Sequence, residues 1–196
     1  MKGDARTQEE VLTALEESAV VVQRLQQDSV ANQLVEVSQV ITRCLKAGHK
    51  VLLLGNGGSA SQAQHIAGEL VGRFLIDRPP LNAVALTTDG TILTCISNDY
   101  SFHDVFARQV RAVGVAGDVV CGLSTSGRSR NVIQALEAGR DLGLVTVGLT
   151  GDDAGDLAPV CDYLLRVPAT STARIQEGHA VMGHVLCEVV ERALFG

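Results

Sequence analysis

Tryptophan is absent from the 196-residue sequence, and aromatic residues make up only 3% of it. A core without large aromatic rings has to be built from Val, Leu, Ile and Ala, which suits helices packed on a buried parallel sheet. Hydrophobic residues make up 46% of the chain and charged residues 19%. That mixture buries enough apolar surface to offset the entropy of folding, so the composition excludes a disordered protein.

Further absences exclude classes of function. Acidic residues (22) outnumber basic ones (16) and give a net charge of −6, so the composition offers no basic stripe for nucleic acid. No apolar run approaches the length of a membrane-spanning helix. The first residues, from Met1 to Asp4, lack the basic-then-apolar plan of a signal peptide. We therefore expect a cytoplasmic protein that has neither nucleic acid nor a membrane as its partner.

The cysteines do not form a recognisable framework. They are odd in number, scattered, and contain no Cys-x-x-Cys pair: Cys44, Cys95, Cys121, Cys161 and Cys187. This spacing disfavours both a disulfide scaffold and a thiolate zinc site. We expect reduced thiols that are buried as small hydrophobic side chains.

The chain changes its pattern near Lys50. Residues 1–48 carry apolar residues at helical spacing and predict two helices, the second ended by Gly48. After Lys50, short apolar runs alternate with helical patterns. The predicted strands are Val51–Leu54, Ala83–Leu86, Val119–Leu123, Val145–Leu149 and Tyr163–Val167. The predicted helices are Ala60–Phe74, Thr91–Ser97, Asp104–Val113, Ser129–Leu142 and Arg174–Leu194.

This alternation predicts an α/β fold with a parallel sheet covered on both faces over residues 49–196. The helical pair of residues 1–48 lies outside the alternation, and its apolar stripe needs a surface. It packs on its own sheet or joins copies from other subunits in a bundle. The second arrangement makes the protein an oligomer.

A glycine-rich loop follows the first predicted strand, with the sequence Gly55-Asn56-Gly57-Gly58-Ser59-Ala60. Glycines allow a tight turn and close approach to a ligand, and the next helix offers unpaired N–H groups to an anion. The pattern also fits a dinucleotide fingerprint, for which Asp89 lies near the required acidic position. A tight turn without any ligand is the third interpretation.

A second loop favours phosphate over the dinucleotide. The segment Leu123-Ser124-Thr125-Ser126-Gly127-Arg128-Ser129 follows the third predicted strand and contains four hydroxyl residues in six positions. Their O–H groups and the local N–H groups can surround a phosphate dianion. A helix cap needs one such residue, not four, so the spacing predicts a phosphate cradle.

Candidate metal ligands lie in two separate segments. His65 and Glu69 are four residues apart in a predicted helix, which places them on one face. Near the C-terminus, Gln176, His179 and His184 lie in the last predicted helix. Two His and one Glu form a reasonable set for zinc, and a Gln oxygen is an unusual fourth ligand. Each residue alone also has an ordinary structural explanation, and spacing does not choose between His179 and His184.

Taken together, these segments resemble the phosphoheptose isomerase family, also called sedoheptulose 7-phosphate isomerases, within the sugar isomerase (SIS) fold. The resemblance covers nearly the whole chain. It is carried by the two loops and by Ala63–Leu70, Ala85–Asp89, Asn98–Tyr100 and Arg174–His179. It implies a three-layer αβα sandwich with a five-stranded parallel sheet, preceded by the helical pair.

The resemblance also implies residue roles. It places one Zn²⁺ per subunit on His65, Glu69, Gln176 and His184, and so selects His184 over His179. It places substrate contacts on Asn56, Gly57, Gly58, Asn98, Asp99, Ser124, Thr125, Ser126, Ser129 and Gln176. It further implies a homotetramer with active sites at subunit contacts and the N-terminal helices at its centre.

The implied reaction converts sedoheptulose 7-phosphate to D-glycero-D-manno-heptose 7-phosphate, the first step toward ADP- or GDP-heptose for surface glycans such as lipopolysaccharide. A proton moves between C1 and C2 through an enediol, so no redox cofactor is needed. The family suggests Glu69 as general base and His184 as general acid. Some members carry Asp where this chain has Ala173.

A non-enzymatic relative that binds the bacterial replication initiator shares the Ala173–Glu177 stretch. It looks like an isomerase that has lost its metal ligands. Glu69 and His184 are both present in this chain and favour the enzyme.

Overall fold

The computed structural model describes the backbone of residues 2–196 and the side chains of residues 6–27 and 29–196. Two helices, α1 (Lys2–Arg24) and α2 (Asp28–Lys46), precede the first strand. The strands are β1 (Val51–Gly55), β2 (Ala83–Ala85), β3 (Val119–Leu123), β4 (Val145–Thr150) and β5 (Tyr163–Arg166). The helices between and after them are α3 (Gly58–Val71), α4 (Gly90–Asp99), α5 (Val105–Val113), α6 (Arg130–Asp141) and α7 (Thr172–Phe195), with 3₁₀ turns η1 (Phe102–Asp104) and η2 (Gly155–Val160).

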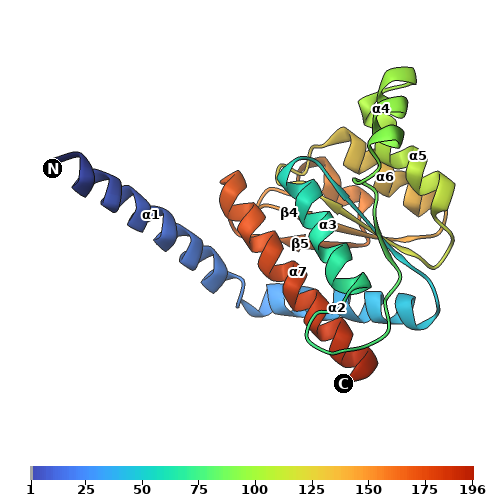
Figure 1. Cartoon of the computed structure of the whole chain (residues 1–196), viewed down its shortest axis with the longest axis horizontal. Coiled ribbons are helices and arrows are strands. Elements are labelled where there is room, and N and C mark those ends of the chain that lie inside the picture. Colours follow the sequence, from blue (N-terminus) through green and yellow to red (C-terminus); the bar gives the residue numbers. More distant parts are fainter. Residues whose placement is uncertain (1) are drawn as a thin grey trace.

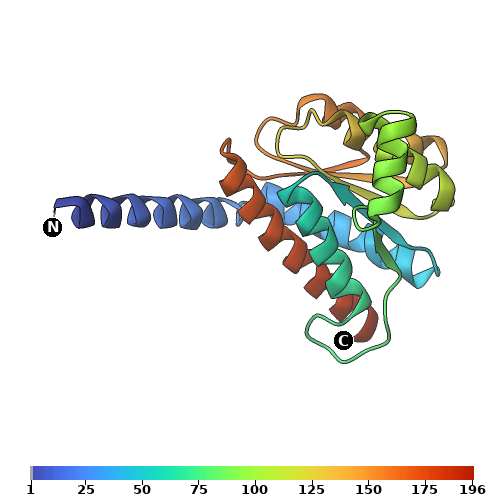
Figure 2. The same cartoon turned by 45° about the horizontal axis from the view of Figure 1, so that its top comes forward.

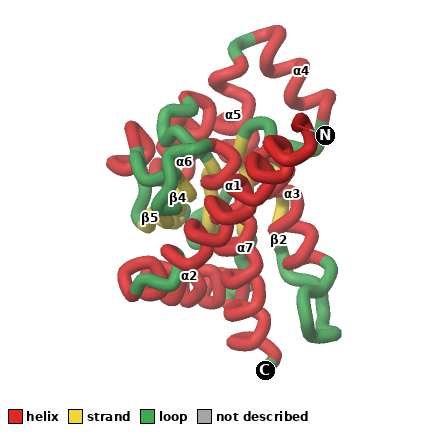
Figure 3. The backbone as a smooth tube through the Cα atoms, turned by 90° about the vertical axis from the view of Figure 1, so that its left-hand side faces the viewer, coloured by secondary structure: helices red, strands yellow, loops and turns green. Residues whose placement is uncertain are grey.

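All five strands pair in parallel, in the order β2-β1-β3-β4-β5. Figure 3 shows β5 and β2 at opposite edges of this sheet. The strand β1 pairs with β2 on one side and with β3 on the other. Every residue of β1 and of β3 is buried, as expected for central strands covered on both faces.

Helices cover the two faces of the sheet and create two apolar cores (Figures 1 and 2). On one face, Leu53 and Cys121 pack with buried residues of α2, α3 and α7. On the other face, Leu52 and Val120 pack with buried residues of α5, α6 and η2. Successive strand residues thus point into opposite cores, which confirms the three-layer αβα sandwich.

The helix α1 extends away from the sandwich as a nearly free rod (Figures 1 and 2). Its apolar side chains Val11, Leu12 and Leu15 are 54%, 52% and 62% exposed. Near its C-terminal end, Val21 is buried in the first core. Arg174 on α7 also donates hydrogen bonds to the Ala14 carbonyl and to Ser18 Oγ. The helix α2, in contrast, packs on the sheet and buries Val37, Val40 and Ile41.

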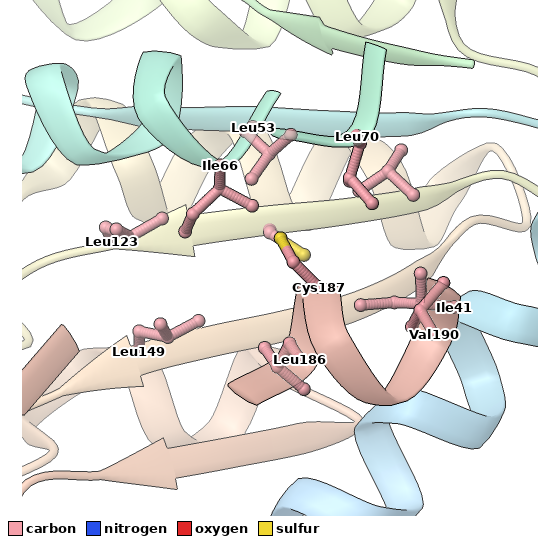
Figure 4. Close-up of a pocket in the computed structure, with 11 residues that line it drawn as sticks. Ile41, Leu53, Ile66, Leu70, Leu123, Leu149, Leu186, Cys187 and Val190 are labelled. Carbon is pink, nitrogen blue, oxygen red and sulfur yellow. The ribbon is translucent and has the colours of Figure 1, made fainter. Parts of the chain in front are cut away.

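A cavity of about 20 Å³ lies between the sheet and the helices α2, α3 and α7. Figure 4 shows Leu53, Leu123 and Leu149 of three strands facing Ile66 and Leu186 across it. Its lining is entirely apolar and offers no hydrogen-bond partner to a water, so we interpret it as a dry packing defect. Among the helices described, none is long and apolar enough to cross a membrane.

The predicted strands agree with the observed ones to within one residue at each end. The largest difference is at α3, which was expected to run to Phe74 but ends at Val71. The chain leaves the helix there because the N–H groups of Phe74, Leu75 and Ile76 donate to the carboxylate of Glu191 instead.

Candidate functional site

The two predicted phosphate loops start side by side at the carboxyl ends of β1 and β3. These strands are neighbours, and Gly55 pairs with Leu123 in register. From β1 the chain continues to one edge strand, β2, whereas from β3 it continues toward the other edge. The gap between β1 and β3 is therefore the topological switch point of the sheet. In open α/β sheets this is where ligands bind.

Glycine at position 58 permits close contact between α3 and α7. A Cβ atom there would lie 2.7 Å from Gln176 Oε1 and would also overlap Gln176 Nε2, so no larger residue fits without displacing that side chain. The Gln62 amide, one turn along α3, donates to the backbone carbonyl of Gln176. Two predicted substrate contacts, Gly58 and Gln176, are thus in direct contact although they come from distant segments.

The hydroxyl-rich loop is ordered by its own residues. Ser124 is 2% exposed, and its Oγ donates to Ser129 Oγ at 2.9 Å. Gly127 has a φ of +63°, and a Cβ atom there would overlap the Ala154 carbonyl. Thr125 and Ser126 are half-buried and exposed, respectively, so they are accessible to a ligand.

Arg128, to which the sequence assigns no role, forms an ion pair beside this loop. Its Nη2 lies 2.6 Å from Asp153 Oδ2. The backbone N–H of Gly155 and then the Arg128 guanidinium lower the pKa of Asp153 below its usual value. Both side chains are more than half exposed, so the pair contributes little to stability.

An amide pair joins the two loops. Asn56 Nδ2 donates to Asn131 Oδ1 at 2.9 Å, and Asn131 Nδ2 donates to Asn56 Oδ1 at 2.8 Å. Asn56 belongs to the glycine loop, and Asn131 lies in the first turn of α6, directly after the hydroxyl-rich loop. Asn131 is only 2% exposed, so the pair is sealed from solvent on that side.

Three of the four predicted metal ligands converge. His65 and Glu69 on α3 and His184 on α7 each present a ligand atom, and these atoms lie within 4.8 Å of one another. His65 Nε2 is 2.7 Å from His184 Nε2 and 3.5 Å from Glu69 Oε1. The Phe74 ring packs against His184 with ring centroids 5.5 Å apart. Two imidazole nitrogens and a carboxylate at this spacing are a donor set that suits a zinc ion.

Gln176, the fourth predicted ligand, lies on α7 two turns before His184. Eight residues of helix correspond to about 12 Å along the axis. The Gln176 amide packs at Gly58, so it lies beside the glycine loop. Its role as a ligand stays a prediction.

His179, the alternative ligand that spacing leaves open, is elsewhere. It is fully buried, and its Nε2 lies 3.1 Å from the Thr150 carbonyl. Burial lowers the pKa of His179 to about 4, which keeps the ring neutral. It is a core residue in contact with β4 and does not belong to the cluster.

The SIS domain model matches residues 15–151. A phosphoheptose isomerase of Campylobacter jejuni is 48% identical over 89% of this chain and 87% of its own length. That of Aneurinibacillus thermoaerophilus is 52% identical over 81% of this chain and 82% of its own. The chain belongs to the phosphoheptose isomerase family. A solved phosphoheptose isomerase structure, from Neisseria gonorrhoeae, has a TM-score of 0.90 at 42% identity and covers 95% of this chain and 99% of that one.

Two substrate contacts implied by the phosphoheptose isomerase family, Asn98 and Asp99, lie apart from the rest. They end α4, which projects from the sandwich (Figure 1). Asn98 Nδ2 donates to Asp99 Oδ1 at 2.9 Å, and this bond lowers the pKa of Asp99. Among the described side chains, no hydrogen bond ties Asn98 or Asp99 to either loop, so their role stays a prediction.

The dinucleotide interpretation of the glycine loop requires an acidic residue, for which the sequence offers Asp89. In the structure this residue has another role. Asp89 is the N-cap of α4, and its Oδ1 accepts from the Ile92 N–H at 2.9 Å. A carboxylate used in this way stabilises the helix start. It has an ordinary structural explanation.

Sequence reasoning missed one buried ion pair behind the cluster. Arg78 Nε lies 2.9 Å from Glu191 Oε1, and both side chains are only 1% exposed. Glu191 also accepts from three backbone N–H groups of the segment that carries Phe74. Burial alone raises the pKa of Glu191, but these N–H donors and Arg78 outweigh it and lower the pKa to about 2. No local motif signals this pair, because 113 residues separate its members.

Proposed function

We propose that this protein isomerises sedoheptulose 7-phosphate to D-glycero-D-manno-heptose 7-phosphate, with one zinc ion per subunit. The observation that carries the proposal is the convergence of His65, Glu69 and His184 on helices that also border the switch point. Family membership supports the same reaction, because the relatives are named phosphoheptose isomerases. The product feeds the synthesis of activated heptose for a surface glycan.

The two loops bind the phosphate in this proposal. Ser124, Thr125, Ser126 and Ser129 supply hydroxyl groups, and the start of α6 adds the positive end of its dipole. His65 lies seven residues beyond Gly58 along α3, about 10 Å on the helix axis. A phosphate held at the loops thus leaves the carbon chain free to extend toward the cluster. Binding energy at this remote end orients the reacting end.

The zinc ion is held by His65, Glu69 and His184 in this proposal, with Gln176 as the fourth ligand. The donor types and their convergence within 4.8 Å fit such an ion. When bound, zinc acts as a Lewis acid on the oxygens at C1 and C2.

Proton transfer falls to the side chains of the same cluster. We assign Glu69 as the base that removes the proton from one carbon of the substrate and His184 as the acid that protonates the substrate oxygen. The Glu69 carboxylate lies 3.5 Å from His65 Nε2, and its side chain is 25% exposed, so it is reachable by a ligand. The Phe74 ring beside His184 limits the positions that its imidazole can take.

A non-enzymatic, protein-binding role is the alternative. The three clustered ligand side chains favour the enzyme, because a protein-binding surface has no need of two imidazoles and a carboxylate at this spacing. Metal analysis separates the two: one zinc per chain supports the enzyme, and a metal-free, inactive protein supports the binder.

The protein assembles through α1 in this proposal, as a homotetramer with active sites at subunit contacts. The helix extends into solvent with Val11, Leu12 and Leu15 exposed. A single amphipathic helix is marginally stable until its apolar face is covered, and copies of the same helix supply a matching surface.

One assay tests the reaction. Purified protein is incubated with sedoheptulose 7-phosphate, with and without a chelator, and the aldose product is followed by NMR. We expect turnover that the chelator removes and added zinc restores. No product from zinc-loaded protein would overturn the proposal.

A further inference from the structure

The amide pair Asn56–Asn131 connects two loops that are distant in the sequence. Asn56 directly precedes Gly57, the N-cap of α3, and Asn131 is the second residue of α6. The pair therefore ties together the N-terminal ends of two helices that start from neighbouring strands. It spans the switch point between β1 and β3.

The chemistry of the pair leaves capacity for a ligand. Each carboxamide has two N–H donors and an oxygen with two lone pairs, and the reciprocal pair uses one donor and one lone pair of each. On the buried Asn131 the remaining groups face protein. On the half-buried Asn56 they remain accessible, and the direction of its spare N–H is fixed by Asn131.

We propose that Asn131 is a positioning residue for substrate binding: it orients the Asn56 amide and holds the two helix N-termini at the spacing that one phosphate group bridges. Asn131 itself does not touch the substrate. The inference rests on the proposed function, because it takes a sugar phosphate as the ligand of these loops.

A double-mutant cycle tests it. The variants are Asn56→Ala, Asn131→Ala and the double variant, with kcat and KM measured for sedoheptulose 7-phosphate. We expect Asn131→Ala to raise KM roughly ten-fold and to change kcat less than about three-fold. The substitution weakens binding of the substrate and of the transition state equally, and it leaves the groups that transfer the proton in place. Because Asn131 acts through Asn56, the double variant should match Asn56→Ala within about two-fold in KM.

Two further variants separate positioning from folding. Thr146→Val removes a different buried hydrogen-bonding side chain, in β4, where Thr146 Oγ1 donates to the Val160 carbonyl at 3.0 Å. It should lower the melting temperature without moving KM. Asn131→Leu keeps the branched shape and the number of heavy atoms of the side chain but removes its hydrogen bonds, and it replaces Asn131→Ala in the cycle if the alanine variant does not fold. Multiplicative effects in the double variant, or an unchanged KM in Asn131→Ala or Asn131→Leu, would overturn the inference.

The cycle has a second readout that does not need turnover. Inorganic phosphate is titrated into the same variants by calorimetry, and its Kd should follow the same non-additive pattern. An inactive wild-type protein would contradict the proposed reaction. Additive losses of phosphate affinity would contradict the role of Asn131 alone.

Discussion

His65 and His184 meet through their Nε2 atoms, 2.7 Å apart, although 119 residues separate them in the chain. At this distance one ring donates an N–H to the other, or both rings turn their lone pairs to a shared cation. Glu69 Oε1, at 3.5 Å from His65 Nε2, adds a negative charge to the same point.

His65→Ala should abolish stoichiometric zinc binding. The substitution removes one of the converging donors, and even the loss of an outer-shell partner costs 10–100-fold in metal affinity, so at least about 100-fold is expected here. Metal content per chain after dialysis measures it. His49→Ala is the matched control, because His49 lies beside Asp118 at 3.6 Å, away from the cluster. A full zinc complement in His65→Ala would contradict the assignment.

Glu69→Gln should keep the fold and lose turnover by roughly 10²–10⁴-fold, because the amide cannot accept the substrate proton. Kinetics followed by NMR, together with a thermal melt, measure both properties. Glu188→Gln changes the same group on α7, where Glu188 pairs with Arg192 at 2.7 Å, and should leave kcat unchanged. Activity near that of the wild type in Glu69→Gln would remove Glu69 as the base.

Glu191→Gln should destabilise the protein by roughly 3–5 kcal/mol at pH 7, because it leaves the buried Arg78 without its charged partner. The pKa of Glu191 falls from an ordinary 4.5 to about 2 on folding. The ionised carboxylate therefore stabilises the folded state fully above pH 4.5. It is lost as the pH falls toward 2. Urea unfolding of wild type and variant between pH 7 and pH 2 should therefore show a difference that shrinks in acid.

The control for this series is Glu10→Gln. Glu10 forms an exposed ion pair with Arg6, and its loss should cost less than about 1 kcal/mol at any pH. A difference between wild type and Glu191→Gln that stays constant down to pH 2 would contradict the ion-pair interpretation.

Leu15→Glu should weaken the assembly without unfolding the sandwich. Leu15 is 62% exposed on α1, so a charge there is tolerated in the monomer but not inside a helical bundle. Sedimentation velocity should show a smaller species. Gln8→Glu adds the same charge to α1 without removing an apolar side chain and should keep the assembly intact. If the assembly of Leu15→Glu keeps the mass of the wild-type assembly, the subunit contact does not involve Leu15.

The sequence predicts most of the fold because its signals are local. Buried runs such as Val51–Leu54 and Val119–Leu123 are followed by glycine or hydroxyl loops and then by helical patterns, which together dictate a covered parallel sheet. The order of the strands in the sheet does not follow from any one of these signals. It depends on which apolar faces meet.

The site is predicted where a motif has fixed spacing. His65 and Glu69 share a helix face by their four-residue separation, and the hydroxyl loop is visible as a run. Spacing alone does not separate His184 from His179. The resemblance selects His184, and the structure places it in the cluster and His179 in the core.

Long-range polar contacts are what sequence reasoning misses. The partners Asn56 and Asn131 are 75 residues apart, and an asparagine in the first turn of a helix has an ordinary explanation as a helix-start residue. The end of α3 is misplaced for the same reason, since the helical pattern continues to Phe74 and the carboxylate that interrupts it comes from Glu191.

A single straight helix, α7, carries Gln176 beside the glycine loop, His184 in the cluster and Glu191 under the Phe74 segment. These positions span about 22 Å along one axis. Because one continuous helix carries all three side chains, helix geometry fixes the spacing between their contacts. A break in the middle of α7 should therefore displace the contacts of Gln176, His184 and Glu191 together.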